Sequence, residues 1–194
     1  MTEGSPLLVA VTGFGDAALL LPLAAAILIW LVLGRARRAA AWWGGSVVAC
    51  VIATAGLKIF FWGCAPRTGV HSPSGHTSLS TLVYGAMALM IAIEYGGWRR
   101  HIAAAGGIGL ILAIGMSRLL LDTHTVPEVI LGWIIGGASL ALFGPGYRRD
   151  RPRDARLSPL LFGAALLVSM LHGRELRAEV LLHRIADYFG IACH

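Results

Sequence analysis

Residues 17–34 read AALLLPLAAAILIWLVLG and contain no charged side chain. A helix needs roughly 17 to 25 apolar residues to cross a hydrocarbon core of about 30 Å. Further stretches share this uncharged, largely apolar character at 39–57, 77–93, 102–117, 129–147 and 157–171. We therefore expect an all-α fold, a polytopic membrane helix bundle with about six transmembrane helices. The stretch at 157–171 is the shortest, and a re-entrant or tilted segment is the alternative for it.

The composition of the whole chain supports this fold class. Of 194 residues, 57% are hydrophobic and 13% are charged, which excludes a disordered chain and argues against an ordinary soluble domain. The scattered cysteines Cys50, Cys64 and Cys193 indicate neither a disulfide scaffold nor a metal or redox Cys-x-x-Cys site. The length fits one domain, so we expect residues 1–194 to form a single integral-membrane domain.

The basic residues predict how the bundle is oriented in the membrane. Because the net charge of +6 comes from arginines clustered between the apolar stretches, it does not indicate a nucleic-acid partner. Ten of the sixteen basic residues lie in alternate loops: Arg35, Arg37, Arg38, Arg99, Arg100, Arg148, Arg149, Arg151, Arg153 and Arg156. Cytoplasmic loops are enriched in Lys and Arg. We therefore expect these loops in the cytoplasm and the 62–75 and 118–125 loops on the extracytoplasmic side.

Two further features bear on the membrane interface. Tryptophans stand near the predicted span ends, as in an interfacial aromatic belt: Trp42, Trp43, Trp62 and Trp98. Residues 174–190 have the apolar spacing of an amphipathic helix, which could lie in the outer interface. A helical tail packed on the bundle is the alternative for that segment.

Polar residues at the ends of the apolar stretches are the functional candidates. Lys58 ends the second stretch, Arg118 ends the fourth, His76 opens the third, and His124 and Glu128 open the fifth. Ionisable groups at membrane depth are costly and therefore mark functional sites by default. All of these positions fall on the predicted extracytoplasmic side. Two cations, two imidazoles and a carboxylate on one membrane face can hold a multiply charged anion.

The same residues carry a family resemblance. Lys58–Pro66, then Pro73-Ser74-Gly75-His76, then Ser117-Arg118-x5-His124-x3-Glu128 resemble the three-part signature of the type-2 phosphatidate phosphatase (lipid phosphate phosphatase) superfamily. The family pattern is K-x6-R-P, P-S-G-H and S-R-x5-H-x3-D. This chain has Ala65 in place of the family arginine and Glu128 in place of the final aspartate. The resemblance covers the motif core at 58–128.

The candidate residues fit phosphoryl transfer. Such a reaction needs positive groups around the phosphoryl oxygens, an in-line nucleophile and a proton donor for the leaving oxygen. Arg118 offers a planar fork, Lys58 offers a point charge, and the amides near Ser74 and Gly75 begin a helix that can receive an anion.

Catalytic roles follow for the remaining residues. His124 is expected to attack phosphorus and form a phosphohistidine, and His76 to protonate the leaving group and then deprotonate water. Glu128, one helical turn beyond His124, is expected to orient the nucleophile. Because Thr125-x-x-Glu128 is also a capping box, a purely helix-capping role is the alternative for Glu128.

Arg67 is the candidate for the missing third cation. It follows the vacant position at Ala65 by two residues and has a side chain long enough to reach back toward the site. The alternative is a solvated loop arginine that only attracts anionic head groups. The sequence offers no carboxylate cluster for a two-metal site, so we expect neither a metal nor another cofactor.

The resemblance implies an integral-membrane phosphatase that acts on a lipid phosphate or diphosphate. Candidate substrates are isoprenyl diphosphates such as undecaprenyl diphosphate, phosphatidate, phosphatidylglycerol phosphate and lipid A phosphate. The short chain resembles small bacterial members, which implies the bacterial inner membrane with the active site facing the extracytoplasmic side. The alternatives are a non-catalytic lipid-phosphate-binding membrane protein and a lipid phosphotransferase.

Overall fold

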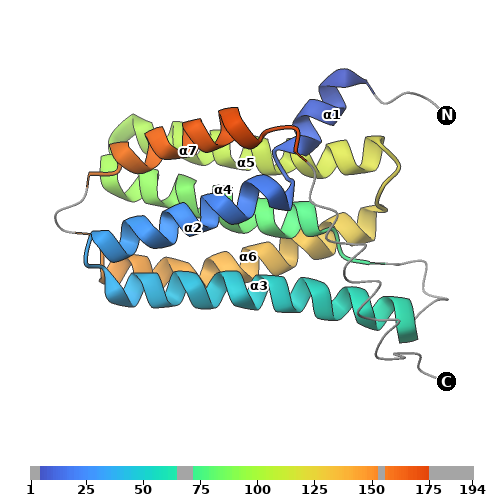
Figure 1. The fold of residues 1–194 in the computed structure, drawn as a ribbon, viewed down its shortest axis with the longest axis horizontal. Helices are drawn as coiled ribbons and strands as arrows, with labels where there is room; N and C mark the ends of the chain where they lie inside the picture. Colours follow the sequence, from blue (N-terminus) through green and yellow to red (C-terminus); the bar gives the residue numbers. More distant parts are fainter. Residues whose placement is uncertain (1–4, 65–71, 153–155, 175–194) are drawn as a thin grey trace.

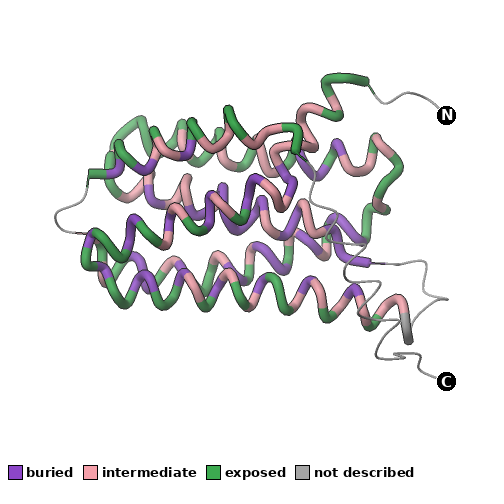
Figure 2. The backbone as a smooth tube through the Cα atoms, in the orientation of Figure 1, coloured by how far each residue is buried: buried purple, intermediate pink, exposed green. Residues whose placement is uncertain are grey.

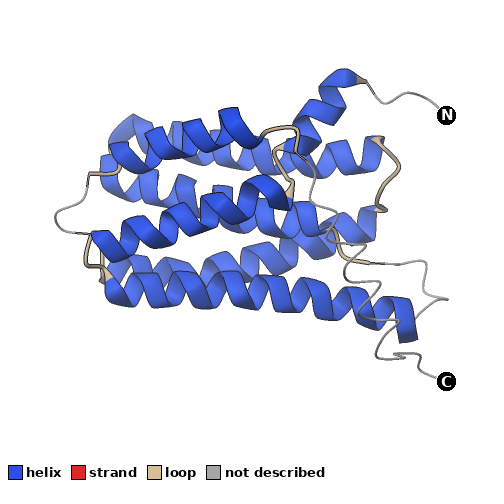
Figure 3. Ribbon diagram, in the orientation of Figure 1, coloured by secondary structure: helices blue, strands red, loops and turns tan. Residues whose placement is uncertain are grey.

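The computed structural model describes residues 5–64, 72–152 and 156–174, and for residues 63 and 64 the backbone alone. The helices in these ranges are α1 (Pro6–Gly13), α2 (Ala17–Leu33), α3 (Arg37–Cys64), α4 (Gly75–Tyr95), α5 (Gly97–Leu120), α6 (Val126–Arg149) and α7 (Ser158–Leu171). The long helices lie side by side in an up-and-down bundle (Figure 1), and these ranges contain no strand (Figure 3). The predicted all-α helix bundle is therefore confirmed.

Five helical segments within these ranges are long and apolar enough to cross a membrane: Pro6–Leu33, Arg37–Trp62, Gly75–Tyr95, Gly97–Leu120 and Val126–Arg149. The predicted sixth span is α7, an apolar helix of 14 residues. At about 1.5 Å per residue it is roughly 21 Å long, which is short of the hydrocarbon thickness. The protein is an integral membrane protein, and α7 is its short helix.

Lipid-facing surfaces are visible in the pattern of burial. Large apolar side chains are exposed along the outer faces of the long helices, including Val48, Ile52, Ile108, Leu112, Ile134 and Leu142. Figure 2 shows exposed turns alternating with buried ones along these helices. Trp42 and Trp98 are also exposed, as an interfacial belt requires. Trp43 is not: it is fully buried, and its Nε1 donates to the Ala24 carbonyl at 2.8 Å, so the belt prediction was wrong for this residue.

Helix α3 is longer than the sequence predicted. The expected span ended at residue 57, with Lys58 at the helix end, whereas α3 continues to Cys64. The reason is that the apolar run Ile59–Trp62 follows Lys58 without a helix breaker. Lys58 therefore lies inside the helix, where its side chain is 3% exposed. Lys58 is thus held by a helix and not by a loop.

Close contact between α4 and α6 sets the geometry of the site. Gly132 and Gly136 on α6 face α4, and a Cβ at these positions would overlap Thr77 and the Ser78 carbonyl, respectively. Small residues allow two helices in a membrane to approach closely. The first residues of α4 and α6 are thereby brought together, and Ser74 N donates to the Glu128 carbonyl at 3.1 Å.

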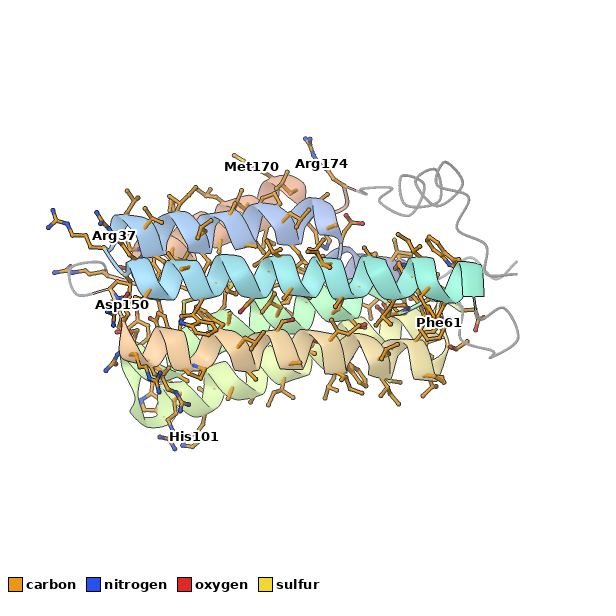
Figure 4. All side chains as sticks on the ribbon, turned by 90° about the horizontal axis from the view of Figure 1, so that it is seen from below. Arg37, Phe61, His101, Asp150, Met170 and Arg174 are labelled. Carbon is orange, nitrogen blue, oxygen red and sulfur yellow. The ribbon has the colours of Figure 1, made fainter. Side chains whose placement is uncertain are left out.

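The arginine-rich turns and the motif residues lie at opposite ends of the bundle. Arg37, His101 and Asp150 are at one end, and Phe61 of α3 is near the other (Figure 4). At the arginine-rich end, Asp150 Oδ2 accepts from the backbone N–H of Arg38 at 2.7 Å and caps the start of α3. The end of α3, the start of α4 and the α5–α6 connection all lie at the opposite end (Figure 1).

Candidate active site

The start of α4 forms the floor of the candidate site. Ser74 is the N-cap of this helix, is fully buried, and its Oγ accepts from Thr77 N at 3.5 Å. The first turn of a helix has backbone N–H groups without partners inside the helix, and the helix dipole makes this end positive. A Cβ at Gly75 would meet only Thr54, at 4.0 Å, so the position where a side chain would begin is not crowded. The Ser74 N–H donates to the Glu128 carbonyl, so an anion at this helix start would be received by the amides that follow Ser74.

His124 is positioned by the tight turn that ends α5. The N–H groups of Thr123 and His124 both donate to the Arg118 carbonyl, at 3.2 and 3.3 Å. Asp122 completes the turn with a φ of 51°, a left-handed conformation that Asp adopts more readily than most residues. The turn places the imidazole of His124 against the first turn of α6.

His124 and Glu128 form a direct pair. Nδ1 of His124 lies 2.9 Å from Oε2 of Glu128, and their side chains are 6% and 5% exposed. An ionised carboxylate can only accept, so the proton of a neutral ring lies on Nδ1 and the lone pair on Nε2. Nε2 is then the nitrogen with nucleophilic character.

Glu128 also ties three chain segments together. Its Oε1 accepts from Ser72 N and its Oε2 from Thr125 N, both at 3.0 Å. The helix-capping contact and the histidine contact, which the sequence offered as alternatives, are both present in the structure. The longer side chain of Glu, compared with the family Asp, spans from the segment before α4 to the start of α6.

Two cations act on the same imidazole. Lys58 Nζ lies 5.8 Å from the centre of the Trp62 ring, and Arg118 Nη1 donates to Thr12 Oγ1 at 3.1 Å. Burial lowers the pKa of His124 below its ordinary value, and the charges of Arg118 and Lys58 lower it further, against the opposing effect of Glu128. The lowered pKa favours the neutral form of the His124 ring, which has a lone pair on Nε2.

Helix α1 and its connection to α2 contribute residues that sequence reasoning missed. Thr12 contacts Arg118, and Asp16 Oδ2 lies 3.7 Å from His76 Nε2. One signal was available, because Asp16 is the only charged residue in the stretch 4–34. Since the two contacts join residues far apart in the chain, spacing within the motifs could not have revealed them.

Some predicted residues fall outside the described ranges. Ala65, Arg67 and the 174–190 segment after Arg174 are among them, so the third cation and the interfacial helix stay predictions. Within the described ranges, no group of three or more His, Cys, Asp or Glu side chains is arranged to hold a metal ion. The structure brings Lys58, Ser74, Gly75, His76, Arg118, His124 and Glu128 to one end of the bundle.

Comparisons with known proteins show the family to which the chain belongs. The profile of the PAP2 superfamily matches residues 61–152. The chain is 32% identical over 190 residues to the "Uncharacterized 22.5 kDa protein in cps region" of Klebsiella pneumoniae, and the match covers 91% of this chain and 88% of that protein. No solved structure matches significantly. The matched region spans the second and third motifs and their helices, and the chain accordingly belongs to the PAP2 superfamily, the lipid phosphate phosphatase group that its motifs resemble.

Proposed function

We propose that the protein is a membrane phosphatase that hydrolyses a lipid phosphate or diphosphate through a phosphohistidine intermediate, without a metal. Family membership supports a phosphatase acting on lipid phosphates. The observation that carries the finer proposal is the pair of His124 and Glu128: a buried, neutral imidazole held at 2.9 Å by a carboxylate, under the influence of two cations.

In the first step, Nε2 of His124 attacks phosphorus, and the bond from phosphorus to the leaving oxygen breaks. His76 gives its proton to that oxygen and becomes neutral. The negative charge on the transferring group is stabilised by Arg118, Lys58 and the first amides of α4 that follow Ser74, whose own N–H donates to the Glu128 carbonyl. Glu128 stabilises the positive charge that develops on the His124 ring.

In the second step, water attacks the phosphohistidine. His76 takes a proton from this water, the bond between phosphorus and His124 breaks, and inorganic phosphate leaves. His76 is then protonated again and His124 is neutral, so the enzyme has returned to its starting state. No redox change or further reactant is required.

The position of the site favours an amphiphilic substrate. The candidate residues lie at the end of a bundle whose outer faces carry exposed apolar side chains, so a phosphate head group can enter while its tail stays in lipid. The arginine-rich turns lie at the other end. By the positive-inside rule we place the site on the extracytoplasmic side of a bacterial inner membrane, with undecaprenyl diphosphate as the first substrate to test.

The test is phosphate release by protein purified in detergent, against a panel of undecaprenyl diphosphate, phosphatidate, phosphatidylglycerol phosphate and lipid A. His124→Ala should abolish turnover and prevent trapping of an acid-labile phosphoenzyme, whereas His101→Ala, the same change at the opposite end, should have no effect. Activity should survive EDTA and be inhibited by vanadate.

Three results would contradict the proposal. Binding of lipid phosphates without turnover would indicate a non-catalytic binding protein. Transfer of the phosphoryl group to an added lipid acceptor in preference to water would indicate a phosphotransferase. Loss of activity in EDTA that magnesium or zinc restores would contradict the metal-free scheme.

A further inference from the structure

The connection between α1 and α2 packs directly on the candidate site. Its residue Gly15 lies against His76 and Ile114: a Cβ there would sit 3.1 Å from His76 Cβ and 2.7 Å from a methyl of Ile114. The connection is held independently by Tyr84, whose hydroxyl donates to the Phe14 carbonyl at 2.8 Å. This part of the chain is therefore a wall of the site that touches the ring of His76.

Asp16 is the ionisable residue of this wall. It is 6% exposed, and its two oxygens have different surroundings: Oδ1 accepts from Ala18 N at 2.7 Å and caps α2, while Oδ2 lies 3.7 Å from Nε2 of His76. The side chain of His76 is 26% exposed, so part of it is accessible from outside the bundle. At 3.7 Å the pair is at ion-pair distance, and catalytic contacts of this kind often shorten when substrate binds.

We propose that Asp16 is a positioning residue for His76, so that the site contains two histidine–carboxylate pairs. The inference rests on the proposed function and deepens it. Glu128 holds the nucleophile His124, and Asp16 holds the proton-transfer group His76. During the first step His76 gives one proton to the leaving oxygen while Asp16 faces the other ring nitrogen; during the second step His76 regains a proton from water.

The capping role of Asp16 can be separated from its charge by substitution. Asn also caps helices through its side-chain oxygen, so Asp16→Asn can keep the bond to Ala18 N while it removes the charge beside His76. Asp16→Ser keeps a capping group but is too short to reach the imidazole. Asp150→Asn is the matched control, because it removes the charge of another helix-capping carboxylate, which accepts from Arg38 N at 2.7 Å at the opposite end of the bundle, and an Asn oxygen can keep that bond.

The experiment compares two substrates that differ in their need for a proton. Phosphatidate, or the alkyl phosphate with the highest wild-type rate, loses an alkoxide that must be protonated. p-Nitrophenyl phosphate loses a phenolate that leaves without help. In Asp16→Asn and in Asp16→Ser, kcat/KM for the alkyl phosphate, which reports the step that forms the phosphohistidine, should fall by about tenfold to a hundredfold, and kcat/KM for the aryl phosphate by less than about threefold. Asp150→Asn should change neither value.

A double-mutant cycle with His76→Ala completes the test. If Asp16 acts through His76, adding Asp16→Asn to His76→Ala should cause no further loss. Equal losses of kcat/KM on both substrates, or losses of kcat/KM that multiply in the double variant, would show that Asp16 serves only to cap α2. A wild-type protein inactive on both substrates would instead overturn the proposed function and this inference with it.

Discussion

Changing Glu128 to Gln tests whether this residue is part of the catalytic apparatus or only a helix cap. The carboxylate accepts three hydrogen bonds: Oε1 from Ser72 N, and Oε2 from Thr125 N and from His124 Nδ1. A Gln has a single acceptor oxygen and a donor NH2 group, so it cannot serve both sides. Its two amide orientations have different consequences.

If the NH2 group faces Ser72, one buried backbone N–H loses its acceptor, which costs about 1 to 3 kcal/mol. His124 then faces a neutral oxygen and loses charge stabilisation. If the NH2 group faces His124, Nδ1 must accept, the ring proton moves to Nε2, and the nucleophilic lone pair is lost. The second effect corresponds to the wrong tautomer that lowers kcat by about 10⁴ in the serine-protease triad. We therefore expect kcat to fall by roughly 10² to 10⁴.

The assay is kcat for the best lipid phosphate, measured together with thermal unfolding in detergent. Glu94→Gln is the matched control at the arginine-rich end, where Glu94 accepts from the Tyr147 hydroxyl at 2.9 Å and a Gln oxygen can keep this bond. The control should keep full activity. A Glu128→Gln protein that unfolds at a lower temperature but keeps kcat within about threefold of wild type would refute the catalytic role of Glu128. Its role would then be to cap the start of α6.

Three other measurements check the remaining structure. Gly136→Ala should destabilise the bundle by about 1 to 3 kcal/mol because its methyl overlaps α4, whereas Gly137→Ala, with nothing within 4 Å, should not; equal unfolding midpoints would contradict the α4–α6 packing. Because burial lowers the pKa of His124 and the nucleophile must be neutral, kcat/KM should fall on the acid side only below pH 6.5; a midpoint at or above 6.5 would exclude a depressed pKa. With the native cysteines replaced, Thr123→Cys should react with an impermeant thiol reagent on intact cells and Arg151→Cys should not; the reverse pattern would invert the orientation.

The sequence was sufficient for features that depend on local composition. Uncharged stretches marked the long helices to within a few residues at most ends, because hydrocarbon thickness imposes a minimum apolar length. The motif residues were found because their spacing along the chain is fixed. The extent of α3 beyond residue 57 was missed, because Lys58 was treated as an end although the apolar run continues after it.

Features that depend on tertiary contacts could not be predicted in this way. Apolar length does not distinguish a lipid-facing tryptophan from a core one, so Trp43 was assigned to the interface although it packs on α2. The contacts of Thr12 and Asp16 join the first helices to motifs more than fifty residues later. They depend on how α1 and α2 pack on α4 and α5, which no pattern within the motifs specifies.

The hydrogen bonds of Glu128 also bear on how the protein responds to its host membrane. A mismatch between bilayer thickness and the apolar length of a helix is relieved largely by tilting. Because Ser72 N–H and Ser74 N–H both bond to Glu128, which also holds His124, we expect the start of α4 and His124 to shift together when α4 and α6 tilt. The separation between the His124 ring and the first turn of α4 should then change little with the acyl-chain length of the surrounding lipids.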